Sequence, residues 1–256
     1  MKIKLLAFDL DGTLLHPILN DKLVCDEYVR MLQDFYDSGI SLCIVTGRGI
    51  NFATRIENEI GRKCYKVCFN GAYVPECDYF SSIDKCVVKD LYDSNHRVLF
   101  FDKDATIFVR EKDREFFDED YQKRYSSKPL HTEKYFCDDS LLNKRIDSSM
   151  IGKVIVYDIN VVIDENRVNV ARKPSSNNAE IVNKVDNKRT GIDSIVKLLS
   201  ISGDDVCVVG DEENDKDMLM NYNNSFIIDH PYNEDLDIST YRINNMLDLK
   251  KYINIK

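Results

Sequence analysis

The first part of the chain alternates short, almost wholly apolar runs with stretches in which apolar residues recur at helical spacing. The runs Lys4–Leu10, Ser41–Val45 and Lys66–Phe69 carry few polar side chains, which is typical of strands buried on both faces of a parallel sheet. Between them, Val24–Asp37 and Asn51–Ile60 place their apolar residues on one face, as amphipathic helices do. This order of strands and helices predicts a doubly wound parallel sheet.

The pattern changes between about Asp78 and Asp186, where the apolar runs indicate paired strands and one or two helices. We therefore expect an α+β insertion here, and not a continuation of the parallel sheet. The expected elements are strands over Arg97–Phe101, Thr106–Val109, Lys153–Tyr157 and Val161–Val170, a hairpin turn at Asp102–Asp104, a turn at Asp164–Asn166, a helix over Phe116–Tyr125 and a loop over Pro174–Asn178.

The alternating pattern resumes at Gly191 and continues to the end of the chain. The sequence therefore predicts an α/β protein. Its core is a Rossmann-like doubly wound parallel sheet made of residues 1–77 and 187–256, with an inserted α+β domain over residues 78–186. The expected elements of the second core segment are helices over Ile192–Leu199, Asp215–Tyr222 and Leu247–Ile253 and strands over Val206–Val209, Ser225–Ile228 and Tyr241–Ile243.

The composition is that of a globular protein, with 43% hydrophobic and 31% charged residues among 256. A net charge of −9 argues against nucleic acid or an anionic membrane as a partner. No apolar stretch approaches the roughly 18 residues of a membrane span, and no signal peptide precedes the first strand, so we expect a cytoplasmic protein. The eight cysteines show no CxxC pair or zinc-ligand spacing, which predicts reduced, mostly structural thiols.

The hexapeptide Asp9-Leu10-Asp11-Gly12-Thr13-Leu14 follows the first buried strand. It places two carboxylates at the carboxyl end of that strand, where open α/β sheets bind their ligands. Two like charges so close together need a cation or a shared proton. The sequence therefore predicts a Mg²⁺ site with a carboxylate nucleophile.

Two further segments supply groups for an anionic ligand. Thr46-Gly47-Arg48 follows the second strand, and its hydroxyl and backbone amide suit a phosphate oxygen. Arg48 is expected to be structural or peripheral. Lys188 lies where the insertion returns to the core and supplies a positive charge, with Lys184 as the alternative.

The segment Gly210–Asp215 follows the strand Val206–Val209 and opens the next helix. Asp211 and Asp215 are hard oxygen ligands at a sheet edge and in a first helical turn, an arrangement that suits Mg²⁺. Glu212 and Glu213, between them, are expected in solvent.

In this order the four segments resemble the motifs of the haloacid dehalogenase superfamily, most of whose members are Mg²⁺-dependent phosphotransferases that form an aspartyl-phosphate. The resemblance implies that Asp9 attacks phosphorus, and that Asp11 protonates the leaving oxygen and later activates water. It implies that Lys188 offsets the charge of the nucleophile. The remaining implied roles are phosphate binding and metal binding. Phosphate is bound by Thr46, Gly47, Lys188 and Asn214, and the metal by Asp9, Asp11 (through its backbone carbonyl), Asp211 and Asp215 (through water or from behind a ligand).

The length of the insertion, together with Asn70-Gly71-Ala72, resembles the Cof-type sugar-phosphatase-like branch, in which an α/β cap closes over the active site. The resemblance implies a phosphatase for small phosphate monoesters such as sugar or polyol phosphates. Two alternatives stay open: a sugar phosphomutase or phosphotransferase, and a non-catalytic regulator that binds a phosphorylated ligand. The expected partner is a small phosphorylated metabolite, the expected state a monomer or weak homo-oligomer, and the candidate cap contacts are His96, Arg97, His131, Lys134, Arg172 and Lys173.

Overall fold

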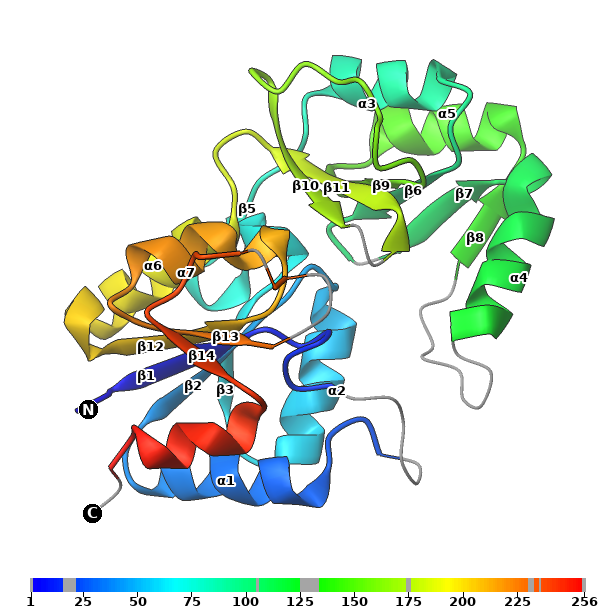
Figure 1. The fold of residues 1–256 in the computed structure, drawn as a ribbon. Helices are drawn as coiled ribbons and strands as arrows, with labels where there is room; N and C mark the ends of the chain where they lie inside the picture. The colour runs from blue at the N-terminus through cyan, green and yellow to red at the C-terminus, as the bar shows by residue number, and fades with distance from the viewer. Residues whose placement is uncertain are drawn as a thin grey trace. The chain divides into compact units, whose positions relative to one another are not determined.

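The computed structural model describes residues 2–15, 22–104, 106–124, 134–173, 176–229, 233–234 and 236–254. The chain folds into two compact units (Figure 1). The first unit combines Met1–Tyr79 with Asp186–Lys256, and the second, Phe80–Val185, is inserted between these two segments.

The first unit is built on a six-stranded sheet in the order β14-β13-β12-β1-β2-β3, in which every pairing is parallel. Successive strands are added in one direction from β1 to β3 and in the other from β12 to β14, so the order reverses between β1 and β12. Such a reversal opens a ligand-binding crevice at the carboxyl ends of the strands. The strands are β1 (Leu5–Phe8), β2 (Ser41–Val45), β3 (Cys64–Val67), β12 (Val206–Gly210), β13 (Asn224–Ile228) and β14 (Tyr241–Ile243).

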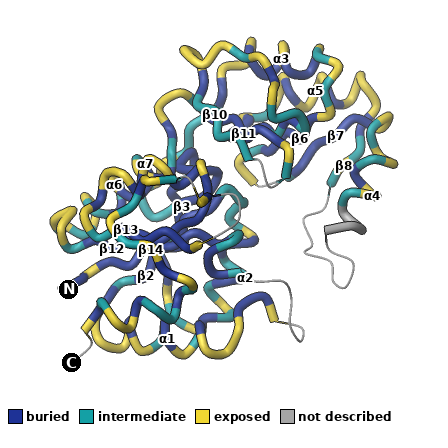
Figure 2. The backbone as a smooth tube through the Cα atoms, viewed as in Figure 1, coloured by how far each residue is buried: buried dark blue, intermediate teal, exposed yellow. Residues whose placement is uncertain are grey.

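Helices cover both faces of this sheet, with α6 and α7 on one side and α1 and α2 on the other (Figure 1). The strands between them are buried along most of their length (Figure 2), which explains their continuous apolar runs. The α/β fold expected from the sequence is thus confirmed. The helical elements and short strands of this unit are α1 (Asp26–Asp37), α2 (Ile50–Ile60), α6 (Lys188–Leu199), α7 (Lys216–Asn221), the 3-10 turns η1 (Phe69–Gly71), η2 (Pro75–Cys77), η5 (Gly203–Asp205), η6 (Glu213–Asp215) and η7 (Met246–Lys251), and β4 (Tyr73–Val74), which pairs with β5 (Tyr79–Phe80).

The second unit contains a six-stranded mixed sheet in the order β10-β11-β9-β6-β7-β8. All its pairings are antiparallel except that of β7 with β8. Its core includes Leu91 of α3, Leu142 of α5, and Phe100 and Val154 of the sheet. The elements are α3 (Lys85–Asp93), β6 (Val98–Asp102), β7 (Ile107–Arg110), η3 (Glu111–Asp113), α4 (Arg114–Arg124), β8 (Lys134–Cys137), α5 (Asp139–Ser148), β9 (Ile151–Val156), β10 (Val168–Lys173) and β11 (Asn178–Asn183).

Several expectations for the insertion were wrong. Two strand segments separated by a turn at Asp164–Asn166 were expected over Val161–Val170. The turn is present, since the Asp164 side chain accepts from the amide of Asn166 at 3.0 Å, but only the end of the second segment forms a strand, as the start of β10. Helices α3 and α5 and strands β8 and β11 were not anticipated. Asn178, expected in a loop, begins β11, whereas Pro174 and Ser175 of that loop lie outside the described residues.

Two further expectations concern the state of the cysteine thiols and the presence of membrane-spanning helices. All eight cysteines lie in the described chain and are unpaired. Burial raises the pKa of several thiols, that of Cys64 to about 12, so they stay protonated and serve as small apolar groups. Within the described ranges, no helix combines the length and the apolar character that a membrane span requires.

Candidate active site

Two acidic residues follow the paired central strands of the first unit. Asp9 comes directly after β1 and Asp211 directly after β12. The backbone amide of Asp9 donates to the carbonyl of Val209 at 3.0 Å, which continues the pairing of the two strands to their ends. Both side chains therefore start from the sheet edge where the strand order reverses.

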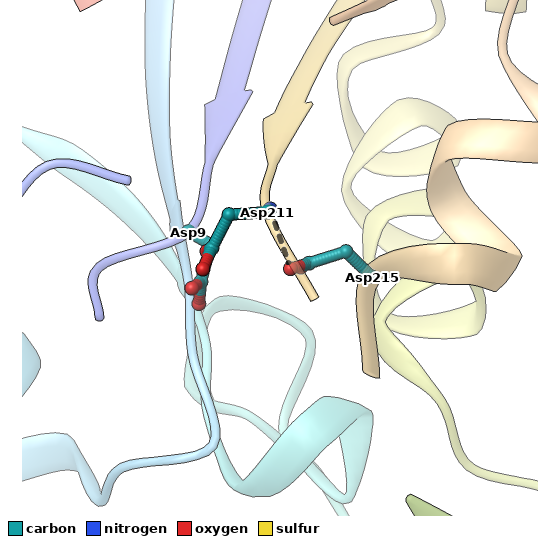
Figure 3. A group of neighbouring side chains, drawn as sticks. All are labelled: Asp9, Asp211 and Asp215. Carbon is teal, nitrogen blue, oxygen red and sulfur yellow. Dashed lines mark hydrogen bonds between the residues drawn. The ribbon is translucent and has the colours of Figure 1, made fainter. Parts of the chain in front are cut away.

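Asp9, Asp211 and Asp215 form a buried acidic group (Figure 3). One oxygen from each carboxylate lies within 4.8 Å of the other two, and the exposed fractions of the residues are 3%, 2% and 0%. Burial raises the pKa of Asp211 well above its ordinary value, and the charges of Asp215 and Asp9 raise it further. The hydroxyl of Thr13 opposes this shift, since it donates to Asp211 Oδ1 at 2.9 Å.

Lys188 provides a positive charge inside this group. Its ammonium donates to Asp9 Oδ1 at 2.6 Å and to Asp215 Oδ1 at 2.7 Å, and the residue is completely buried. Lys188 is the first residue of α6, whose start is fixed by Asn187 and Thr190 through reciprocal capping bonds. The capped helix start therefore sets the direction of the lysine.

Asp215 also shapes the loop after β12. Its Oδ2 accepts from the backbone amides of Asp211 at 3.0 Å and Glu212 at 3.1 Å; Figure 3 draws the first of these bonds. Asn233 holds the same loop from the other side, because its Nδ2 donates to the carbonyl of Asp211 at 2.6 Å. The side chains of Asp215 and Asn233 thus fix the start of this loop, at Asp211 and Glu212.

The donor set fits a divalent cation. Three carboxylates face one ammonium group, so a cation that prefers oxygen ligands would offset the remaining negative charge. Gly12 contributes by its lack of a side chain: its φ is +84°, and a Cβ there would overlap the carboxylate of Asp211. A buried acidic group of this kind can hold a metal ion.

Asp11 lies outside the acidic group and pairs with Arg48. The guanidinium donates from Nε to Asp11 Oδ2 at 2.7 Å and from Nη2 to Oδ1 at 2.6 Å, and its Cζ lies 4.1 Å from the ring centre of Phe52. The Asp11 side chain is 40% exposed. A two-point bond of this kind fixes the direction of the carboxylate. Arg48, expected to be structural or peripheral, contacts the proposed general acid.

The other predicted phosphate ligands lie on neighbouring loops. Thr46 is fully buried, and its Oγ1 accepts from the amide of Arg48 at 3.0 Å, which leaves the hydroxyl hydrogen to be donated elsewhere. Gly47 follows it and is half-buried. Asn214 is buried in the loop after β12, and its Nδ2 donates to Asn70 Oδ1 at 3.4 Å.

The candidate cap contacts have partners within the second unit. His96 lies 3.4 Å from a carboxylate oxygen of Asp158, and Arg172 pairs with Glu165 at 3.0 Å. Lys184 donates to the carbonyl of Glu165, so Lys188 is the lysine that binds the acidic group. Arg97 and Lys134 lie over the rings of Phe116 and Phe117, Lys173 ends β10, and His131 lies outside the described residues.

Sequence reasoning assigned no part in the site to Thr13, Asn70 or Asn233, and it did not anticipate that Arg48 holds Asp11. Arg48 could have been found, because β2 pairs directly with β1 and their following loops must adjoin. Glu212 was expected in solvent but is buried, since it caps the turn that contains Asp215.

Comparisons with known proteins bear on the whole chain. The sequence profile of the haloacid dehalogenase-like hydrolases matches residues 6–232. The 5-amino-6-(5-phospho-D-ribitylamino)uracil phosphatase YitU of Bacillus subtilis is 36% identical over 95 residues, which are 35% of this chain and 34% of that protein. The alignment thus spans about a third of the length of this curated relative.

Solved structures share the fold over nearly the full length. A HAD/COF-like hydrolase from Plasmodium vivax matches with a TM-score of 0.76 at 22% identity, over 95% of this chain and 90% of that chain. A subclass IIB sugar phosphatase of the same superfamily matches with a TM-score of 0.76 at 18% identity, over 99% and 100% of the two chains.

Proposed function

Since the chain belongs to the haloacid dehalogenase-like hydrolases, we propose that it is a Mg²⁺-dependent phosphatase of small phosphate monoesters, chiefly sugar or polyol phosphates. The resemblance seen in the four motifs is confirmed by the match to this family. The observation that carries the proposal is the Lys188 ammonium held between Asp9 and Asp215 inside a buried acidic group. The Asp9 carboxylate, which is the proposed nucleophile, thus lies beside the positive charge of Lys188, and this charge attracts a phosphoryl group.

Asp9 and Asp11 divide the chemistry between them. In the first step the Asp9 carboxylate forms a bond to phosphorus, the bond from phosphorus to the ester oxygen breaks, and Asp11 gives its proton to that oxygen. In the second step water attacks the aspartyl-phosphate, Asp11 takes a proton from the water, and the bond between Asp9 and phosphorus breaks. Because Asp11 is held by two bonds from Arg48, its carboxylate must leave this guanidinium to carry the proton.

The surrounding groups bind and neutralise the phosphoryl group. Thr46 donates its hydroxyl hydrogen to a phosphate oxygen, Gly47 offers its backbone amide, and Lys188 offsets the charge of Asp9. Mg²⁺, held by Asp9, Asp211 and the backbone carbonyl of residue 11, with Asp215 behind them, would supply Lewis-acid charge neutralisation when bound.

The substrate class rests on the relatives. One is named as a phosphatase of a phosphorylated ribityl compound and another as a sugar phosphatase, and both names describe phosphate esters of polyhydroxylated carbon chains. We assign the inserted segment, residues 78–186 by the sequence pattern, as the cap domain that selects among such esters. The division of the chain into two compact units supports this assignment.

A phosphate-release screen tests the proposal. The purified full chain would be incubated with Mg²⁺ and a panel of sugar phosphates, polyol phosphates and an aryl phosphate, with Asp9→Asn as the catalytic control. A surface variant of the same chemistry, Asp37→Asn, replaces an exposed carboxylate that pairs with Arg62 and controls for the substitution itself. We expect free phosphate with the wild type and Asp37→Asn and none with Asp9→Asn.

Two outcomes would favour the alternatives. An isomerised sugar phosphate without free phosphate would indicate a phosphomutase. Binding of phosphorylated ligands without turnover of any ester, including the aryl phosphate, would indicate a regulator.

A further inference from the structure

Two consecutive residues after β3, Phe69 and Asn70, adopt a left-handed backbone. Their φ angles are +51° and +52°, and Gly71 follows at +103°. This region is unfavourable for residues with a side chain, although asparagine tolerates it better than phenylalanine does. Both residues are buried. Such a conformation persists only where surrounding contacts hold it, and it is common beside functional sites.

The turn contacts the loop after the neighbouring strand β2. The amide of Phe69 donates to the carbonyl of Arg48 at 3.1 Å, and the amide of Asn70 donates to the carbonyl of Thr46 at 3.0 Å. The left-handed conformation therefore fixes where the Asn70 side chain starts, relative to the loop that carries the proposed phosphate ligand Thr46.

The Asn70 side chain reaches a third loop. Its Oδ1 accepts from Nδ2 of Asn214, in the segment after β12, at 3.4 Å. The remaining acceptor of Asn214, Oδ1, is buried and has no hydrogen-bond partner in the described part of the chain. An unpaired buried acceptor costs free energy, so this oxygen is suited to a ligand that brings a hydrogen-bond donor.

We propose that Asn70 is a positioning residue, which holds the carboxamide of Asn214 so that Asn214 Oδ1 accepts a hydrogen bond from a hydroxyl of the bound phosphate ester. This inference rests on the proposed function. It explains why an asparagine occupies a left-handed position that glycine would fill with less strain. A hydroxyl-bearing ester, such as a polyol or sugar phosphate, supplies the donor that the site lacks.

The test separates the backbone role of residue 70 from its side-chain role. Asn70→Gly keeps the left-handed turn without strain, and Asn70→Ala makes it unfavourable, but both remove the contact with Asn214. If Asn70 positions Asn214, kcat/KM for a polyol phosphate falls about five- to tenfold in both variants, mainly through KM. The Tm falls in both variants, because each leaves the Nδ2 donor of Asn214 without its partner, and it falls further in Asn70→Ala.

Asn177 offers a matched control in the second unit. Its φ is +50° and it is exposed, so Asn177→Gly and Asn177→Ala should repeat the Tm difference without changing kcat/KM. In an Asn214→Ala background, Asn70→Gly should have an effect of less than twofold, because its partner is already absent. Either of two results would overturn the inference. In the first, Asn70→Gly keeps kcat/KM within twofold of the wild type. In the second, Asn70→Gly lowers kcat/KM as much in the Asn214→Ala background as it does in the wild-type background.

A second measurement does not depend on turnover. The ¹⁵N signal of the Asn214 side-chain amide, assigned by its loss in Asn214→Ala, should shift in Asn70→Gly and stay in place in Asn177→Gly. An unmoved signal would refute the contact itself. A wild type that releases no phosphate, with the signal shifted as expected, would instead refute the proposed function.

Discussion

Replacing Lys188 with methionine should destabilise the metal-free protein and make its stability depend on Mg²⁺. The lysine is completely buried, and its ammonium makes two short bonds, to Asp9 at 2.6 Å and to Asp215 at 2.7 Å. Methionine fills a similar volume but carries no charge. Asp9, Asp211 and Asp215 would then share a buried site without the lysine charge.

The size of the effect follows from the burial of the pair. Removing one partner of a buried ion pair typically costs about 3–5 kcal/mol, because the other charge stays desolvated. For a chain of this size, each kcal/mol corresponds to roughly 2–4 °C in Tm, so we expect the Tm of Lys188→Met to fall by roughly 6–20 °C in EDTA. Mg²⁺ should recover a large part of this loss, since it binds the same carboxylates and only in the folded state.

The assay is thermal unfolding followed by circular dichroism at neutral pH, in EDTA and in excess Mg²⁺. Lys66→Met is the matched control, because Lys66 is also buried and pairs with Glu57 at 2.8 Å and Glu76 at 3.6 Å. This variant should also lose stability, but Mg²⁺ should change its Tm no more than that of the wild type. A Lys188→Met protein as stable as the wild type in EDTA, or a Mg²⁺ response equal to that of Lys66→Met, would refute this reasoning.

Three further outcomes are expected. Asp9→Asn should leave the fold intact and lower phosphate release by several orders of magnitude, because an amide is a poor nucleophile; activity within tenfold of the wild type in a steady-state assay would contradict the covalent route. Gly12→Ala should weaken Mg²⁺ binding in calorimetry at least tenfold, because its Cβ would overlap the Asp211 carboxylate at a φ of +84°; unchanged affinity would exclude Asp211 as a ligand. Asp211 has a folded pKa raised above its unfolded value of 3.8, so the stability that its protonation contributes is present below pH 3.8 and is lost as pH rises through the folded pKa. In urea unfolding without metal, the free energy of unfolding of Asp211→Asn should therefore rise relative to that of the wild type as pH increases from 3.8 to the folded pKa. A difference between the two proteins that does not change with pH would contradict the raised pKa.

The parallel core could be predicted from the sequence because its signals are local. A strand buried on both faces, such as Ser41–Val45, must be apolar throughout, and its observed bounds match the expected ones. The insertion was less predictable. Strand β8 (Lys134–Cys137) lies at a sheet edge and is only partly buried, while β11 begins at Asn178 after a polar segment typical of loops. Strand β8 pairs with β7, which is distant in sequence, and β11 lies between β10 and β9 in the sheet, so the strand conformation of both depends on partners that their own sequence patterns do not identify.

The same distinction holds within the candidate site. Asp9 and Asp211 could be placed side by side, because acids that follow parallel strands meet at one sheet edge. The proposed role of Asn70 could not be predicted from the sequence, because it depends on a left-handed backbone at a residue that spacing alone assigns to a loop.

The pairing of acids and bases around the site argues for a single divalent ion. Four of the carboxylates in the loops after β1 and β12 belong to the candidate site, those of Asp9, Asp11, Asp211 and Asp215. Lys188 pairs with Asp9 and Asp215, and Arg48 pairs with Asp11, so these two bases supply two positive charges. Four negative charges against these two leave two, which one Mg²⁺ would balance. Without metal, the raised pKa of Asp211 shows how the protein meets the same excess, because a proton on this carboxyl removes one of the two charges. Metal binding and proton release at Asp211 are therefore expected to be linked.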